Sequence, residues 1–142
     1  MRKNKVLLVE DEKVDALGVG RVLKELYPSV LLEVLATGEQ AIDWIHRFRQ
    51  NGELIVLILM DMTLPRMEGL TLISQIKAHK DLAYTPIVIL SGNDSFKAIQ
   101  YAYQSGASAY LVKRQELNDS KRMLASIFHF WIENNVHHSP VS

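Results

Sequence analysis

Five short apolar runs, separated by longer segments with helical spacing, restrict the fold of this chain more than any other feature. The runs cover Lys5–Val9, Leu31–Leu35, Ile55–Met60, Ile87–Leu90 and Ala109–Val112. Continuous apolar runs of this length are typical of strands that are buried on both faces of a parallel sheet. The segments between them have apolar residues three and four positions apart, as amphipathic helices do. The alternation predicts an α/β fold with a parallel sheet wrapped by helices.

Length and charge set limits on the domain organisation and on the classes of partner. A chain of 142 residues is long enough for one domain with a substantial core, which we expect over residues 1–136, with a C-terminal tail at 137–142. Sixteen basic residues balance sixteen acidic ones, so charge gives no reason to expect binding to nucleic acid or to a membrane surface. No apolar run approaches a signal peptide or a membrane span, which favours the cytoplasm.

Chemically reactive side chains follow four of the predicted strands. Glu10 and Asp11 follow the first, Asp61 the third, Ser91 the fourth and Lys113 the fifth. Taken singly, each residue has an ordinary explanation as a turn former, a loop hydroxyl or a solvated lysine. Because the carboxyl ends of parallel strands meet at one edge of the sheet, where open α/β sheets bind ligands, the set as a whole predicts a functional site.

Four segments give the chain its resemblance to a known family. "VLLVEDE", "LILMDMTLPRMEGL", "TPIVILSG" and "GASAYLVK" occur in this order and extend over nearly the whole chain. Together they resemble the receiver domains of two-component response regulators. The resemblance implies a flavodoxin-like, doubly wound three-layer sandwich, with five helices around a five-stranded parallel sheet in the order 2-1-3-4-5.

The resemblance also implies a phosphoryl acceptor and a cation site. Asp61 would be the phosphoacceptor, with Glu10 and Asp11 helping to hold a divalent cation and Thr63 supplying its backbone carbonyl. Three neighbouring carboxylates repel one another unless a cation lies among them. Hard oxygen ligands with a few waters suit Mg²⁺, which is therefore the expected cofactor.

Three further roles follow from the same resemblance. Ser91 would hydrogen-bond one phosphoryl oxygen, Lys113 would pair with another, and Tyr110 would change rotamer when Ser91 moves. The chain departs from the family at Arg114, where receivers usually have a proline joined to the lysine by a cis peptide. A cis bond without proline costs about 2.5 to 4 kcal/mol, so the departure bears on how Lys113 is aimed.

The expected function is that of a single-domain response regulator, not an enzyme, that receives its phosphoryl group from a histidine kinase or phosphotransfer protein. Two alternatives stay open. Haloacid dehalogenase phosphatases also use an aspartate after an apolar strand, but they normally have a second Asp where this chain has Thr63. The other alternative is a degenerate receiver that acts as an interaction module without phosphorylation.

The last of the predicted helices, "SKRMLASIFHFWIENN" (residues 120–135), carries a wide apolar stripe. On a helical wheel centred on Ile127, Phe128 and Ile132 lie far enough round to be partly exposed. Receivers commonly associate through the fourth helix, fifth strand and fifth helix, as the resemblance implies. We therefore expect these two residues, with Tyr101 or Tyr103 of the fourth helix, to form a homodimer or partner surface.

Overall fold

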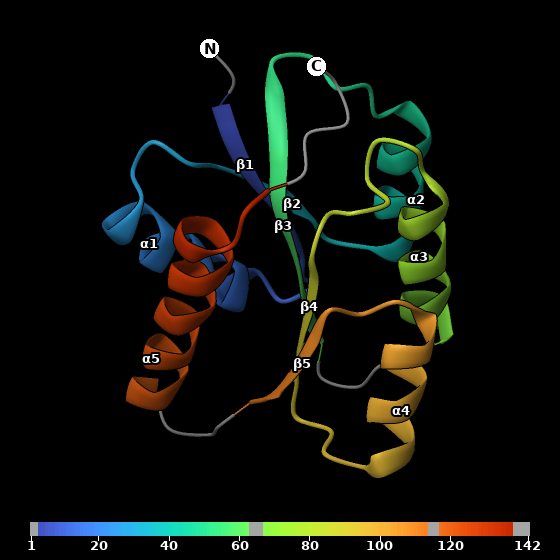
Figure 1. Cartoon of the computed structure of the whole chain (residues 1–142). Helices are drawn as coiled ribbons and strands as arrows, with labels where there is room; N and C mark the ends of the chain where they lie inside the picture. Colours follow the sequence, from blue (N-terminus) through green and yellow to red (C-terminus); the bar gives the residue numbers. More distant parts are fainter. Residues whose placement is uncertain (1–2, 63–66, 114–116, 138–142) are drawn as a thin grey trace.

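The predicted parallel sheet is confirmed by the computed structural model, which describes residues 3–62, 67–113 and 117–137 (Figure 1). In this part of the chain five parallel strands lie in the order β2-β1-β3-β4-β5. The strands are β1 (Lys3–Val9), β2 (Leu31–Leu35), β3 (Glu53–Met62), β4 (Ile87–Ser91) and β5 (Ala109–Val112). The helices are α1 (Lys13–Leu26), α2 (Gly38–Arg47), α3 (Met67–Ala78), α4 (Phe96–Ser105) and α5 (Leu117–Phe128), which continues as a π-helix, η1 (His129–Asn134).

The helices cover both faces of the sheet and make three layers. Helices α1 and α5 lie on one face, and α2, α3 and α4 lie on the other (Figure 1). Each face has its own apolar core, and the strands contribute to both. Each helix in the described ranges is too short or too polar to cross a lipid bilayer.

A β-bulge in β3 decides which face its last residues reach. Lys5 pairs with Ile55 but Val6 pairs with Leu57, so Val56 is an extra residue in β3. Val56 and Leu57 consequently both pack in the core under α1 and α5. Because side chains otherwise alternate along a strand, this one extra residue exchanges the faces of every later position, including Asp61.

Local sequence signals set the ends of two helices. Thr37 precedes α2, and its hydroxyl accepts a hydrogen bond from the Gln40 backbone N–H at 3.0 Å. Ser95 precedes α4 and accepts from the Ala98 N–H at 3.2 Å, as N-capping residues do. Gly106 is the C-cap of α4 and has a φ of 120°, a conformation that residues with a side chain rarely adopt.

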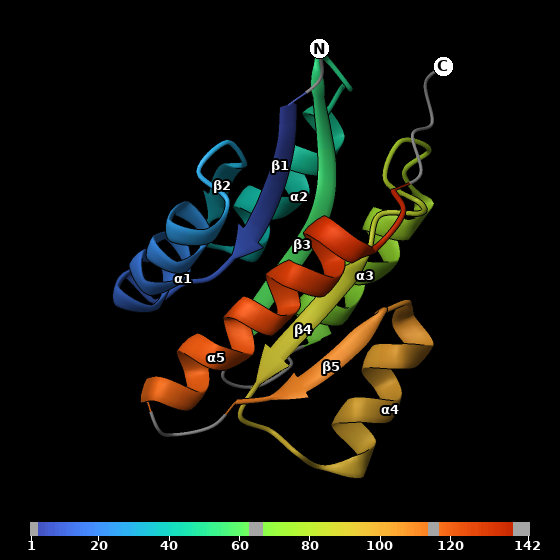
Figure 2. The same cartoon turned by 60° about the vertical axis from the view of Figure 1, so that its left-hand side comes forward.

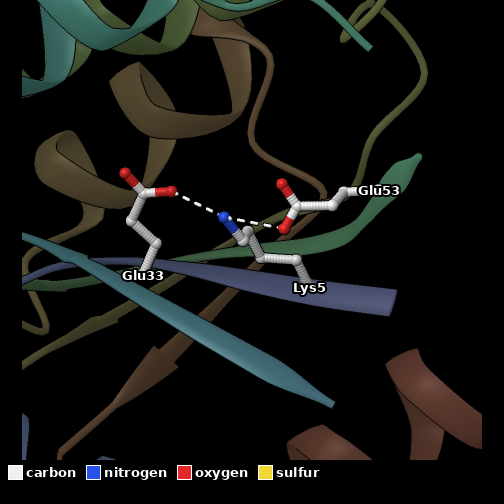
Figure 3. Close-up of polar contacts among 3 residues, drawn as sticks. All are labelled: Lys5, Glu33 and Glu53. Atoms are coloured by element: carbon white, nitrogen blue, oxygen red, sulfur yellow. Dashed lines mark hydrogen bonds and ion pairs between the residues drawn. The ribbon is translucent and has the colours of Figure 1, made fainter. Parts of the chain in front are cut away.

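An ion triad joins the three strands β1, β2 and β3 (Figure 3). The Lys5 ammonium on β1 contacts Glu33 on β2 at 2.8 Å and Glu53 on β3 at 3.0 Å. Partial burial by itself lowers the pKa of Lys5, but its two acidic partners outweigh this effect and raise the pKa. The triad thus keeps a half-buried lysine charged while it links β1 to its two neighbours, β2 and β3.

The expectation that Phe128 and Ile132 are partly exposed is wrong. Phe128 is 0% exposed and Ile132 is 8% exposed, and both belong to the core under α1 and α5. Leu124, Ile127, Phe128 and Ile132 follow the i, i+3, i+4, i+8 spacing of one buried stripe. The helical wheel centred on Ile127 wrongly placed Phe128 and Ile132 outside this stripe. The helix also changes to π geometry at His129, and η1 packs beside β3 (Figure 2). Phe130 is the exposed aromatic of this segment instead.

Candidate functional site

The reactive residues predicted from the strand ends meet at one edge of the sheet. Asp61 is the next-to-last residue of β3 and pairs with Leu90 of β4. Ser91 ends β4, while Glu10 and Lys113 directly follow β1 and β5. Asp61, Ser91 and Glu10 are buried. Acidic side chains are rarely fully buried unless they are paired.

Lys113 provides the positive charge of the site. Its ammonium contacts Asp61 Oδ1 directly and lies 3.9 Å from Asp15 Oδ2 on α1. Burial by itself lowers the pKa of Lys113, but Asp61, followed by Glu10 and Asp15, raises it. Lys113 therefore stays protonated, and its backbone N–H donates to the Ser91 carbonyl at 2.7 Å, which fixes the start of the loop after β5.

Glu10 is the most perturbed acid of the site. Burial, followed by repulsion from Asp61, raises its pKa to about 8, although Lys113 acts in the opposite direction. Asp15 adds further repulsion and a hydrogen bond that favours the protonated form. In the absence of another cation, Glu10 is therefore protonated at neutral pH.

The balance of charges suits a hard divalent cation. Burial raises the pKa of Asp61, and Lys113 offsets only part of this effect. Two buried carboxylates thus share one ammonium, with the exposed Asp11 and Asp15 adding negative charge nearby. Oxygen donors with an excess of negative charge fit Mg²⁺. Among the described residues no three acidic or histidine side chains are already gathered as a metal cluster.

A chain of hydrogen bonds connects Ser91 to Tyr110. The Asn93 backbone N–H donates to Ser91 Oγ at 3.1 Å. The Asn93 carbonyl accepts from the Tyr110 hydroxyl at 2.6 Å. Tyr110 is half-buried on β5, and its own backbone N–H donates to Tyr103 Oη at 3.1 Å. One residue of the loop between β4 and α4 therefore bridges the predicted hydroxyl and the predicted switch residue.

Sequence reasoning missed Asp15 and Asn93. Asp15 lies in the first turn of α1, and its closeness in sequence to Glu10 and Asp11 was a usable signal. Asn93 acts through its backbone, which leaves no signal in the side-chain pattern. Thr63 and Arg114 lie outside the described residues. Tyr101 and Tyr103 are exposed on α4, and their part in an interface stays a prediction.

A groove extends from the site between α1 and α5. It has a volume of about 900 Å³, and Asp61 and Lys113 line one end of it. Val14 and Leu17 of α1 also line it and are largely exposed, at 78% and 54%. The site is thus approached across an apolar surface of α1.

Known proteins share this sequence pattern and this fold. The sequence model of the response regulator receiver domain matches residues 6–125. Response regulator Rcp1 of Synechocystis is 32% identical over 130 residues, which are 90% of this chain and 88% of that protein. Its Mn²⁺-bound crystal structure superposes with a TM-score of 0.82 at 30% identity and covers 95% of this chain and 99% of that one.

Two further solved structures are similar to this chain. The phosphorylated cyanobacterial phytochrome response regulator RcpA has a TM-score of 0.82 at 25% identity, over 96% of this chain and 98% of that one. The receiver domain of the sensor histidine kinase PA1611 from Pseudomonas aeruginosa has magnesium in its active-site cleft. It has a TM-score of 0.70 at 27% identity, over 92% and 98% of the two chains.

Proposed function

Because this chain belongs to the response regulator receiver domain family, we propose that it accepts a phosphoryl group on Asp61 from the phosphohistidine of a histidine kinase or phosphotransfer protein. The observation that carries the proposal is the direct contact of the buried Asp61 carboxylate with the Lys113 ammonium, beside the perturbed Glu10. The family match gives no support to the phosphatase alternative. The cytoplasmic location and the domain boundary after residue 136 remain predictions.

The transfer needs positioning and charge stabilisation more than covalent chemistry from the protein. An Asp61 carboxylate oxygen forms the new P–O bond while the P–N bond to the donor imidazole breaks and the imidazole leaves. The Lys113 ammonium already contacts this carboxylate, and it would pair with a phosphoryl oxygen as negative charge develops on the phosphoryl group. The product is a mixed anhydride, which water can hydrolyse, so the signal resets.

Glu10, Asp11 and Asp61, with the Thr63 backbone carbonyl, would hold Mg²⁺. The bound ion supplies positive charge to the transferring phosphoryl group. The excess of carboxylates and the raised pKa of Glu10 support this assignment, as do the metal-bound Rcp1 and PA1611 receiver structures. Ionised Glu10 and Asp61 would both gain a partner that Lys113 alone does not provide.

The Ser91–Asn93–Tyr110 chain supports the predicted switch. If Ser91 turns its hydroxyl to a phosphoryl oxygen, the Asn93 N–H loses or changes its acceptor. Asn93 also holds the Tyr110 hydroxyl, so a shift of this loop alters the position of Tyr110. Phosphorylation would in this way reach the outer surface of α4 and β5.

The groove between α1 and α5 would receive the phosphodonor. It leads directly to Asp61 and Lys113, and its exposed Val14 and Leu17 suit an apolar stripe on a histidine-bearing helix.

The proposed homodimer surface contains fewer residues than the sequence predicted, because the side chains of Phe128 and Ile132 are in the core. It would consist of α4 and β5, with the exposed Tyr101 and Tyr103.

The decisive experiment is phosphorylation of purified protein by a small phosphoryl donor with Mg²⁺, read by intact-mass spectrometry. We expect one phosphoryl group on the wild type and none on Asp61→Asn. Asp43→Asn is the matched control, because Asp43 is exposed on α2 and pairs only with Arg47 among the described residues. Equal uptake by wild type and Asp61→Asn would place the acceptor elsewhere. A folded wild type without any uptake would favour the degenerate receiver.

A further inference from the structure

A second apolar groove lies on the other side of α1, next to the edge strand β2. Its volume is about 420 Å³, and its floor consists of Leu17 on α1 with Leu32 and Val34 on β2. Leu17 is 54% exposed and Val34 is 43% exposed, so the floor is open to solvent. Gly20 brings α1 close to β2 here, since a Cβ at this position would lie 3.3 Å from Leu32 Cδ2.

Cations without ion-pair partners line the helical side of this groove. Lys13, Arg21 and Lys24 lie along it, and none forms an ion pair with another described residue. The two acids of α1 already have partners, Asp15 with Lys113 and Glu25 with Lys121 of α5. Lys13 and Lys24 therefore leave positive charge without an ion-pair partner beside the groove.

The free edge of β2 has the same length as the row of cations on α1 from Lys13 to Lys24. Strand β2 has one neighbour, β1, in the described sheet, so its outer backbone groups have no strand partner. Its five residues span about 16 Å, at roughly 3.3 Å per residue. Positions 13 and 24 are eleven residues apart on α1, which is also about 16 Å at 1.5 Å per residue.

We propose that this groove binds an extended acidic segment of a partner protein, which adds as a sixth strand to the edge of β2. Backbone hydrogen bonds to β2 provide the pairing, as in other cases of strand addition. The side chains that face α1 come from alternate positions of the segment. Their order is acid, apolar, acid, because Lys13 and Lys24 flank Leu17 and the β2 floor. This site is separate from Asp61 and does not depend on its phosphorylation.

The test is a titration of ¹⁵N-labelled protein with the five-residue peptide Glu-Thr-Val-Thr-Glu, blocked at both ends. We expect saturable shifts of the backbone amides of residues 31–35 and a dissociation constant that rises as salt is added, as screening requires. The peptide Lys-Thr-Val-Thr-Lys is expected to leave these amides unmoved. Failure of the acidic peptide to shift them at millimolar concentration, or equal shifts with both peptides, would overturn the proposal.

Charge reversal locates the site. The double variant Lys13→Glu, Lys24→Glu is expected to bind the acidic peptide at least ten-fold more weakly. Lys80→Glu, Lys97→Glu is the matched control, because these exposed lysines lie away from the groove. Equal weakening in both variants would reduce the effect to net charge and overturn the site. Phosphatidylserine vesicles form the last arm: binding to vesicles but not to the peptide, lost in the first variant, would show a membrane surface instead.

Discussion

At the scale of single residues, the site contains more buried negative charge than it can neutralise. Glu10 and Asp61 are both buried, and the only ammonium recorded in contact with Asp61 in the described residues is that of Lys113. Binding a proton removes a buried charge and the repulsion between the two carboxylates, which is why the pKa of Glu10 rises to about 8. The same imbalance that costs stability prepares the site for a dication.

The pH dependence of stability follows from this raised pKa. The pKa of Glu10 is 4.5 in the unfolded reference and about 8 in the folded protein. The metal-free native state therefore holds a proton that the unfolded state has released. Its stabilising effect is complete below the unfolded value and is lost as the pH rises through about 8. We expect the free energy of unfolding in chelator to fall between about pH 5 and 8 by about 1–3 kcal/mol.

Glu10→Gln is expected to remove most of this slope in urea titrations, whereas Glu39→Gln, an exposed acid on α2, keeps it. Saturating Mg²⁺ should also flatten the wild-type profile, because the ion takes the place of the proton. Parallel profiles for wild type and Glu10→Gln would contradict the assignment of the proton to Glu10.

At the scale of secondary-structure elements, the end of α5 is part of the core. We expect Phe128→Ala to lower the free energy of unfolding by about 3–5 kcal/mol, because a fully buried ring is lost and a cavity remains. Phe130→Ala removes the same group from an exposed position of η1 and should change stability by less than about 1 kcal/mol. Chemical denaturation measures both, and equal effects would contradict the assignment of the buried stripe.

At the same scale, substitution by alanine is expected to change the stability in opposite directions at two glycines. Gly106→Ala is expected to destabilise by about 1–3 kcal/mol, because φ is 120° there and the new Cβ would lie 2.9 Å from Lys77 Cγ. Gly18→Ala lies within α1 with no atom within 4 Å of the new Cβ. It should stabilise by about 0.5–1 kcal/mol through helix propensity. Thermal unfolding distinguishes the two signs, and a shared sign would refute the argument.

At the scale of the whole molecule, the two grooves and the exposed aromatic side chains are the surface regions that we propose to bind partners. The groove beside Asp61 lies between α1 and α5, the acidic-segment groove lies between α1 and β2, and the exposed Tyr101 and Tyr103 lie on α4. Leu17 and Arg21 line both grooves, so a phosphodonor and a partner segment would meet adjacent surfaces of α1, whereas a second copy of the chain would meet α4. Asn93 joins Ser91 to Tyr110, whose backbone N–H donates to Tyr103 of α4, so phosphorylation at Asp61 would have a short path to α4.

Self-association is the prediction that belongs to this scale. With beryllofluoride and Mg²⁺ as a phosphoryl analogue, we expect the wild type to shift towards a dimer in analytical ultracentrifugation. Tyr101→Asp should remain monomeric, because the charge lies on the proposed α4 face. Leu26→Asp is the control, an exposed apolar residue on α1 away from that face. Monomeric sedimentation of every sample would exclude the homodimer.

The sequence by itself determined the elements and the members of the site. The apolar runs are local signals, so two strands have the predicted bounds and the other three are longer by one to four residues. Parallel strands end together, which is why the acids, Ser91 and Lys113 were predictable as a set. Gly106 is a similarly local signal for the end of α4, since its conformational freedom is a property of one residue.

Only the tertiary structure decided which way these residues face and what charge they carry. The extra residue Val56 directs Asp61 to the side of α1 and α5, and no run of apolar letters reveals a bulge. Burial separates Glu10 from the exposed Asp11, although the two are adjacent in the chain. Phe128 is buried because it belongs to the core that α1 and α5 form with the sheet. Register, burial and pKa depend on groups far away in the sequence, whereas hydrophobic spacing and strand ends do not.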